Sequence, residues 1–284
     1  MVKSSATTPG TLYIVATPIG NRDDISLRAL ETLKSVDSIL AEDTRHSLQL
    51  LTALGIQKPL MSLHAHNETE KSQQIVALLE QGKSLALVSD AGTPLISDPG
   101  FPLVKLAREK KIAVIPIPGP CALITALSAA GIPCDSFTFI GFLPAKTTAR
   151  KNKLAALSTS EHTLVFYEST HRICDCIDDI IAVYGSDYEF VLAKELTKVF
   201  ERFVQGTAVT IKNWLQEDAA HCKGEFVLLL PPKLQETTSL QEEETLSILL
   251  KELPLKQAVK LAASLTKGNK NELYKKALVL QNRT

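Results

Sequence analysis

Residues 84–100 read SLALVSDAGTPLISDPG. The apolar run 85–88 is typical of a strand buried on both faces, and residues 101–110 predict a helix. Between them lies a turn rich in aspartate, glycine and proline. In an open parallel sheet, ligands bind at the carboxyl ends of the strands, where such turns lie. An ordinary strand-to-helix loop is the plainer interpretation, but similar turns follow other strands in the same half of the chain.

Three turns of this kind occur, at residues 17–21, 90–100 and 118–122. Small residues there let backbone amides and carbonyls approach a ligand closely, although each turn alone could simply be tight. No two of the thirteen glycines are separated by a single residue, so the G-x-G-x-x-G fingerprint does not occur, and neither does a Walker loop. The sequence therefore argues against a standard dinucleotide enzyme or kinase.

The first half of the chain alternates strand and helix patterns. Ser26 is a plausible N-cap for the first helix. Strands separated by helices indicate parallel pairing and an α/β sheet. The predicted strands are 12–16, 38–41, 85–88 and 113–117, and the predicted helices are 26–33, 47–54, 71–81, 101–110 and 122–130.

The second half has a different pattern, with more predicted strands. The short connection between the strands at 190–193 and 200–205 suggests an antiparallel hairpin. We therefore expect a mixed sheet. The predicted strands are 137–142, 163–167, 190–193, 200–205 and 226–230, the helices are 173–184 and 209–217, and three short helices follow residue 244. The expected organisation is an α/β domain at 11–133, a mixed-sheet α/β domain at 134–231, a linker at 232–243 and a small helical domain at 244–284.

Composition narrows the class of protein. The formal net charge of the 284 residues is zero, so a generic polyanion binder is not expected. The five cysteines are scattered without a second close pair, and His64 and His66 lie in a polar stretch, so no metal site is predicted. No apolar run approaches the roughly 20 residues that span a bilayer, and residues 1–10 are polar. We expect a cytoplasmic protein that does not contact a membrane.

Six collinear segments resemble the tetrapyrrole methylase superfamily, and more closely its bacterial 16S rRNA (cytidine-2′-O)-methyltransferase I branch. The resemblance covers residues 11–230, and the C-terminal helices match a small domain that this branch often carries. The segments are LYIVATPIGN at 12–21, AEDTR at 41–45, VSDAGTPLISDPG at 88–100, IGFLP at 140–144, FYESTHR at 166–172 and AKELTK at 193–198.

Two departures from the superfamily pattern matter. The first turn has ATPIG at 16–20 in place of Gly-x-Gly-Pro-Gly, which argues against a porphyrinoid substrate. Cys121 stands where the superfamily usually has serine or threonine. A backbone contact with the cofactor is therefore carried over at this position, and a hydroxyl contact is not.

The resemblance implies the tetrapyrrole methylase fold, with S-adenosylmethionine bound in the cleft between the two α/β domains. Methyl transfer from a sulfonium needs mainly positioning, assisted by a base near the acceptor hydroxyl. The base candidates are Lys194, Glu195, Asp43 and Glu168, although Lys194 and Glu195 could equally form a surface ion pair. The residues carried over as cofactor contacts are Pro18, Asp90, Ala91, Gly92, Thr93, Ile96, Cys121, Ala122, Tyr167, Glu168, Leu196 and Gly224.

Local basic clusters favour RNA binding on this neutral chain. Residues 136–160 contain no acidic residue, and residues 251–284 carry seven lysines and one arginine against two glutamates. Solvated helix faces are the alternative, especially for the tail. The predicted RNA contacts are Arg45 and Arg172 as phosphate clamps, and Lys146, Arg150, Lys151 and Lys153 in a loop.

The resulting expectation is an enzyme that methylates a ribose 2′-oxygen, on a cytidine in the decoding region of 16S rRNA, with the small ribosomal subunit as substrate. The family also implies a homodimer. Two alternatives stay open. A tetrapyrrole-type small-molecule methylase would turn over a porphyrinoid and would not need the basic residues at 146–153. A non-catalytic ribosome assembly or RNA-binding factor would keep its function when the cofactor turn is mutated.

Overall fold

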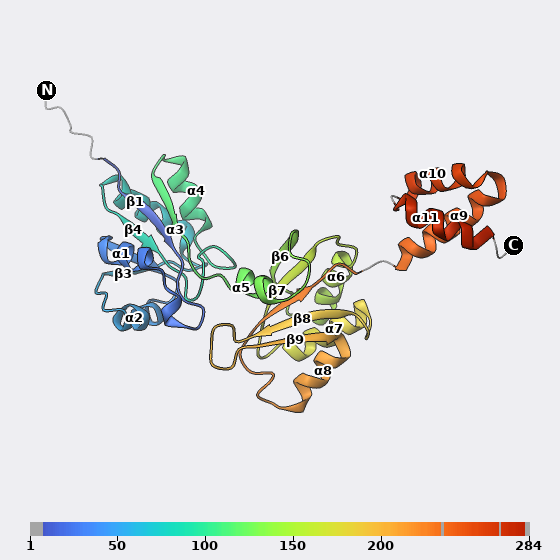
Figure 1. Ribbon diagram of the computed structural model, residues 1–284. Helices are drawn as coiled ribbons and strands as arrows, with labels where there is room; N and C mark the ends of the chain where they lie inside the picture. The colour runs from blue at the N-terminus through green and yellow to red at the C-terminus, as the bar shows by residue number, and fades with distance from the viewer. Residues whose placement is uncertain (1–7, 234–235, 267, 282–284) are drawn as a thin grey trace, which may run out of the picture. The chain divides into compact units, whose positions relative to one another are not determined.

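The structure is a computed structural model that describes residues 8–233, 236–266 and 268–281. The chain divides after Pro232 into two compact units (Figure 1). The first unit contains both sheets, and the second contains only helices.

The first sheet has five strands in the order β3-β2-β4-β1-β5, and all neighbours are parallel. Its central strand, β4, belongs to the segment 84–100, so the turn after it lies at the middle of the sheet edge. Strand β3 is absent from the sequence prediction because its three residues are only partly buried and end in a serine, so no continuous apolar run marks them as it marks β4. The strands are β1 (Thr11–Val15), β2 (Ser38–Ala41), β3 (Leu60–Ser62), β4 (Leu85–Leu87) and β5 (Ala113–Ile117).

Helices cover both faces of this sheet (Figure 1). Helices α3 (Glu68–Glu80) and α4 (Phe101–Glu109) pack on one face around Leu12, and α1 (Leu27–Ser35) and α2 (Thr44–Ala53) pack on the other around Val15. The short 3-10 helix η1 (Arg22–Asp24) precedes α1. The Ser26 hydroxyl accepts a 3.1 Å hydrogen bond from the Ala29 N–H, which confirms the predicted N-cap.

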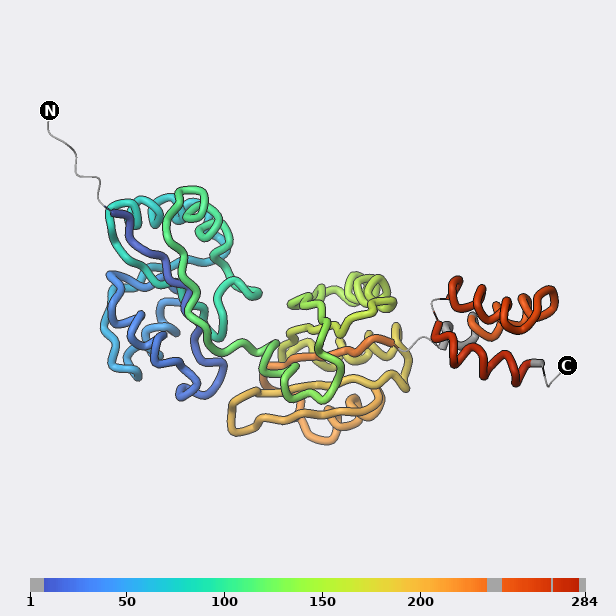
Figure 2. The backbone as a smooth tube through the Cα atoms, turned by 45° about the horizontal axis from the view of Figure 1, so that its top comes forward, coloured from blue at the N-terminus to red at the C-terminus, as the bar shows by residue number. Residues whose placement is uncertain are grey.

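Strand β5 forms one edge of this sheet and contains Pro116. The carbonyl of Pro116 accepts a hydrogen bond from the Arg28 guanidinium at 3.3 Å. After β5 the chain passes through α5 (Ala122–Ala129) into the second sheet, as the green tube of Figure 2 shows.

The second sheet is mixed, as expected. Its order is β6-β7-β10-β8-β9; β6 and β7 are parallel, and every other neighbouring pair is antiparallel. The predicted hairpin is β8–β9, although β9 begins at residue 202 rather than 200. The strands are β6 (Phe137–Phe142), β7 (Thr163–Ser169), β8 (Glu189–Lys194), β9 (Arg202–Thr207) and β10 (Glu225–Leu230).

Helix α5 packs on one face of the second sheet, against Val165, Val191 and Val227. Helices α6 (Thr147–Leu157), α7 (Ile173–Tyr184) and α8 (Ala208–Glu217) cover the other face. Helix α6 corrects the sequence prediction, which treated its basic residues as a loop. The helical spacing of apolar residues is hard to see here, because one of the residues that face the core is an arginine, Arg150, which is only 1% exposed.

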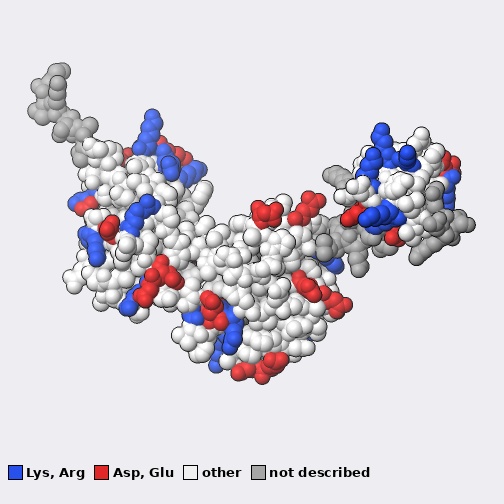
Figure 3. Space-filling view, in the orientation of Figure 1, with Lys and Arg blue, Asp and Glu red and all other residues white. Residues whose placement is uncertain are grey.

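The second unit is a three-helix cluster with a small core of its own around Leu246, Val259 and Leu273. Figure 3 shows several basic side chains together on the visible face of this unit. Lys267 and Arg283, counted in the basic tail, lie outside the described residues. The helices are α9 (Glu236–Glu252), α10 (Leu255–Thr266) and α11 (Lys270–Gln281).

The predicted linker at 232–243 is largely wrong, because α9 begins at Glu236. The run of polar residues resembles a linker in sequence, but Glu242 is only 8% exposed and its carboxylate forms a 2.7 Å ion pair with Lys276. None of the helices that the structure describes combines the length and apolar character that crossing a bilayer requires.

Candidate active site

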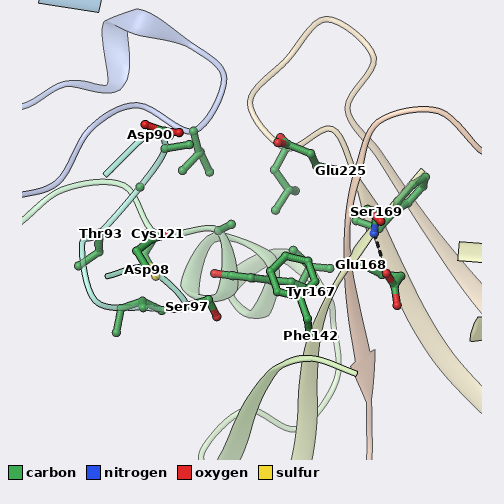
Figure 4. Close-up of a pocket in the computed structure, with 18 of the residues that line it drawn as sticks. Asp90, Thr93, Ser97, Asp98, Cys121, Phe142, Tyr167, Glu168, Ser169 and Glu225 are labelled. Atoms are coloured by element: carbon green, nitrogen blue, oxygen red, sulfur yellow. Dashed lines mark hydrogen bonds between the residues drawn. The ribbon is translucent and has the colours of Figure 1, made fainter. Parts of the chain in front are cut away.

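A pocket of about 370 Å³ opens in the first unit, between the edge of the first sheet and the second sheet (Figure 4). The turn after β4 and the start of α5 form one wall. The end of β7 and the start of β10 form the other. The lining residues are Ile19, Glu42, Asp90, Ala91, Gly92, Thr93, Ile96, Ser97, Asp98, Cys121, Ala122, Phe142, Tyr167, Glu168, Ser169, Leu196, Glu225, Phe226 and Val227.

Backbone contacts fix the turn after β4. Thr17 and Gly92 exchange two backbone hydrogen bonds, of 2.8 and 3.1 Å, which join the turn after β1 to the turn after β4. The Thr93 hydroxyl donates to the carbonyl of Pro120 at 3.0 Å, which joins the turn after β5 as well. The three turns that the sequence singles out therefore meet at one edge of the sheet.

This turn also holds unusual backbone conformations. Leu95 and Ser97 have φ of 71° and 72°, although neither is glycine. Such conformations cost on the order of 1–3 kcal/mol each and persist only where the surrounding structure enforces them. They cluster at functional sites, and here Ser97 lines the pocket.

The pocket is strongly acidic. Five acidic residues line it, and none of its described lining residues is lysine, arginine or histidine. Glu168 and Glu225 form ion pairs with Arg172 and Lys198, whereas the other three have no ion pair with any described residue. Glu42 follows β2 and Asp90 follows β4; since these strands are parallel neighbours, their carboxylates converge at the same edge. Burial, together with the negative charges of Glu42 and Asp90, raises the pKa of Asp98 to about 6. Burial likewise raises the pKa of Glu42.

Tyr167 connects the two walls. Its hydroxyl accepts a 3.1 Å hydrogen bond from the Leu123 N–H in the first turn of α5. Cys121, the residue before α5, makes no side-chain capping bond, so the tyrosine satisfies an amide that an N-cap side chain often takes. Burial raises the pKa of Tyr167, which keeps it protonated. In Figure 4 its ring points toward the Cys121 side of the pocket.

Glu168 is the most buried of the lining acidic residues, with 2% of the residue exposed. Side chains alternate along β7, and Tyr167 packs on the α5 face, so the Glu168 side chain lies on the opposite face with Phe166. Its Oε1 accepts from the Ser169 N–H at 2.9 Å and lies 3.3 Å from Nε of Arg172. Its Oε2 is buried and has no hydrogen-bond partner among the described residues. Arg172 also donates to the carbonyl of Leu143. The guanidinium predicted to clamp phosphate is thus engaged within the protein.

The other predicted base candidates do not line the pocket. Asp43 caps α2, accepting from the Arg45 and His46 N–H groups, and these bonds lower its pKa. Lys194 is 6% exposed at the end of β8, in register with Phe226 of β10. Glu195 accepts from the Glu225 N–H and from Lys198, each at 2.9 Å.

Of the twelve predicted cofactor contacts, Pro18 and Gly224 lie outside the lining, and each is adjacent in sequence to a lining residue. The other ten are brought together there. Sequence reasoning missed nine lining residues. Six lie inside the quoted motifs, namely Ile19, Glu42, Ser97, Asp98, Phe142 and Ser169, and the other three are Glu225, Phe226 and Val227.

The predicted RNA contacts divide into exposed and buried side chains. Arg45, Lys146 and Lys153 are exposed, and Lys151 is half-buried, 3.5 Å from Asp179. The prediction for Arg150 is corrected. Its Nε donates to Asp179 at 2.7 Å with both side chains buried, so it has no access to a phosphate.

Comparison with known proteins agrees with this architecture. The family described as Tetrapyrrole (Corrin/Porphyrin) Methylases matches residues 11–212, and the RsmI C-terminal HTH domain matches residues 236–281. Among solved structures, a diphthine synthase shares the fold with a TM-score of 0.63 at 16% identity, covering 79% of this chain and 90% of that one. A uroporphyrin-III-C-methyltransferase from Thermus thermophilus gives 0.56 at 18% identity, covering 78% and 94%.

Curated relatives are much more similar. The ribosomal RNA small subunit methyltransferase I of Haemophilus influenzae is 52% identical over 269 residues, covering 93% of this chain and 95% of the relative. The protein of the same name from Escherichia coli O157:H7 is 50% identical over 281 residues, covering 98% of each chain. With its two α/β domains and its C-terminal helices all matched, the chain belongs to the ribosomal RNA small subunit methyltransferase I family and is a methyltransferase of the tetrapyrrole methylase fold.

Proposed function

We propose that this enzyme transfers the methyl group of S-adenosylmethionine to the ribose 2′-oxygen of a cytidine in the decoding region of 16S rRNA, with the small ribosomal subunit as substrate. The relatives' name supports a small-subunit rRNA substrate. The observation that carries the cofactor assignment is a pocket with no basic side chain among its described lining residues and with three acidic residues, Glu42, Asp90 and Asp98, that have no ion pair among the described residues.

The residues present fit this cofactor. S-adenosylmethionine bears a sulfonium and an ammonium cation against a single carboxylate, so it is a net cation, and a partly dehydrated acidic pocket favours cations over neutral or anionic ligands. Ile19, Ile96 and Leu196 provide apolar surface for a nucleoside. The backbone of residues 91–93 offers polar groups at close approach. When bound, the cofactor supplies a methyl group already activated by its sulfonium.

The protein's own contribution is positioning and a proton acceptor. We infer that Asp98 accepts the proton of the 2′-hydroxyl. It lines the pocket, and with a pKa of about 6 it is ionised at neutral pH while still basic enough to take a proton. Glu168 is less suited to this role, because its carboxylate pairs with Arg172 on the face of β7 opposite Tyr167. Lys194 and Glu195 are assigned to supporting the β8 end of the wall, and Asp43 to capping α2.

Substrate docking is assigned to the exposed basic side chains. Arg45, Lys146 and Lys153 are free to meet phosphates, together with lysines of the second unit such as Lys260 and Lys275. We also propose that the enzyme works in the cytoplasm, where its substrate is assembled, and as a homodimer, as the resemblance implies.

The test is methyl transfer from labelled S-adenosylmethionine to three acceptors: small subunits lacking the native methylation, naked 16S rRNA, and a porphyrinoid. The nucleosides are then identified by mass spectrometry. A 2′-O-methylcytidine on the subunit is the expected product. Label on the porphyrinoid alone would identify a small-molecule methylase. If Gly92→Asp abolished cofactor binding yet left subunit maturation intact, the protein would be an assembly factor rather than a catalyst.

A further inference from the structure

The loop between β8 and β9 exposes two adjacent apolar side chains at its tip. Val199 is 94% exposed and Phe200 is 72% exposed. Neither belongs to any of the hydrophobic clusters formed by the described residues. The sequence predicts that Phe200 opens a strand, but β9 begins at Arg202, so the ring is released from the sheet. Folding of the described residues therefore gives no reason for a phenylalanine at this position.

The loop is ordered in spite of its exposure. The carboxylate of Glu201 accepts a hydrogen bond from the Thr197 N–H at 2.6 Å. Two backbone hydrogen bonds close successive turns: the Lys198 N–H donates to the Glu195 carbonyl, and the Glu201 N–H donates to the Lys198 carbonyl. Glu195 and Thr197 adopt positive φ values of 50° and 65° to make this path. An aromatic ring on such a loop is preorganised, so little entropy is lost when it binds a partner.

The same loop is fastened to both sides of the pocket mouth. On the second-sheet side, Leu196 lines the pocket, and the Lys198 ammonium lies 2.7 Å from the carboxylate of Glu225, another lining residue. On the first-sheet side, the Thr197 hydroxyl accepts from the Asn21 N–H at 3.0 Å. Figure 1 shows the loop projecting beyond the ends of β8 and β9.

The charges around the tip are mixed: Glu201 is acidic, and Lys198 already pairs with Glu195 and Glu225. One cation among them is unpaired. Arg202 follows the loop and is exposed, and its guanidinium has no hydrogen bond or ion pair with any residue that the structure describes. An exposed aromatic ring beside an unpaired arginine is the combination with which proteins bind single-stranded RNA, the ring stacking on a base and the guanidinium meeting a phosphate. A second copy of the chain would have no comparable need for the free guanidinium.

We propose that Phe200 stacks on an unpaired base of the RNA next to the nucleotide being methylated, with Val199 extending the apolar surface and Arg202 contacting the backbone. The loop thereby holds the strand over the pocket. This inference rests on the proposed function, since it needs an RNA acceptor at that pocket.

The test compares Phe200→Ala with Phe200→Trp, and with Phe101→Ala as a matched control. Phe101 is also an exposed phenylalanine, at 67%, but it begins α4 and does not line the pocket. Each variant is assayed for methylation of unmethylated small subunits over a range of subunit concentrations. Cofactor affinity is measured by calorimetry, and oligomeric state by light scattering.

Loss of one stacked base is expected to raise KM for the subunit on the order of 10-fold in Phe200→Ala, with the cofactor Kd and oligomeric state unchanged. Phe200→Trp is expected to keep wild-type KM, and Phe101→Ala to match wild type. An unchanged KM in Phe200→Ala overturns the proposal, and so does a parallel loss of dimer and activity, which would make the tip a contact between copies. If the wild-type enzyme itself fails to methylate subunits, the proposed function falls and this inference with it.

Discussion

Two arginine–carboxylate pairs belong to the second sheet and its helices, and they are satisfied to different degrees. Arg150 and Asp179 lie 2.7 Å apart with 1% and 4% of their side chains exposed. Arg150 also donates to the carbonyl of Ala145, and Lys151 approaches the second oxygen of Asp179 at 3.5 Å. This pair joins α6 to α7 and leaves no polar atom of either side chain buried without a partner.

The pair of Glu168 and Arg172 is less complete. The two groups are 3.3 Å apart, and both Oε2 of Glu168 and Nε of Arg172 are buried without a hydrogen bond among the described residues. Buried polar atoms are normally satisfied, so this exception indicates a place for a bound water. The comparison teaches that two buried pairs on the same layer of helices differ: the first is fully satisfied by the protein, and the second is not.

The largest effect is expected from Asp179→Ala. Removing one partner of a buried ion pair leaves Arg150 charged in the interior, which costs about 3–5 kcal/mol of unfolding free energy. Urea denaturation measures this cost. Asp178→Ala is the matched control, because Asp178 is 53% exposed and its ion pair with Lys212 is worth less than about 1 kcal/mol. If both variants lost the same unfolding free energy, the buried pair would contribute no more to stability than the exposed one.

Glu168→Gln tests the second pair. The amide oxygen can still accept from the Ser169 N–H, and Arg172 is 26% exposed, so the unfolding free energy is expected to fall by only about 1–2 kcal/mol. Cofactor affinity, measured by calorimetry on folded protein, is expected to stay within about 2-fold of wild type, because this carboxylate pairs with Arg172 on the face of β7 opposite Tyr167. A loss on the order of 10-fold would show instead that the free oxygen meets the ligand.

Asp98→Asn is expected to change stability and cofactor affinity in opposite directions. The folded protein holds the Asp98 proton more tightly than the unfolded chain does, because the pKa rises from 3.8 to about 6. Stability therefore declines as pH rises through that window, and the asparagine variant is expected to be more stable at pH 8 by about 1 kcal/mol, after allowance for solvent screening.

The same variant is expected to bind the cofactor several-fold more weakly at pH 8 and equally well at pH 5, where the wild-type carboxyl is protonated. Thermal melts and calorimetry at the two pH values provide the readouts. A wild-type affinity that does not change between pH 5 and pH 8 would exclude Asp98 from the cation-binding charges.

The smallest effect is expected from Lys153→Ala on α6. Unlike Arg150 on the same helix, Lys153 is exposed, so unfolding free energy is expected to stay within about 0.5 kcal/mol of wild type. If it meets a phosphate, the slope of log affinity for RNA against log salt falls by about 1. A slope identical to wild type would leave α6 without a part in docking.

Much of the fold could be predicted from the sequence, and the exceptions have physical reasons. Alternating apolar runs and turns predicted the parallel sheet and the mixed sheet, and Ser26 marked a helix start. Helix α6 was not predicted, because Arg150 occupies a core position. A buried arginine is tolerated there because it pairs with Asp179 on another helix. A pairing across 29 residues leaves no local pattern.

The candidate site likewise has features that the sequence predicts and features that it does not. Glycine and proline identified the turns in the sequence, because the backbone conformation of a turn depends mainly on the residues within it. The acidity of the pocket was missed, because it depends on β2 and β4 being neighbours, which places Glu42 beside Asp90 and Asp98. Phe226 and Val227 could not be singled out, because a strand residue facing a pocket and one facing the core are equally apolar.

Pro116 has a consequence for self-association. Its nitrogen carries no hydrogen, its carbonyl is already taken by Arg28, and it lies on β5, an edge strand. An incoming strand would therefore find neither a donor nor a free acceptor at Pro116, next to the last residue of this edge strand. This position hinders the sheet from growing sideways through β5, so a second copy of the enzyme is not expected to associate by pairing a strand with it.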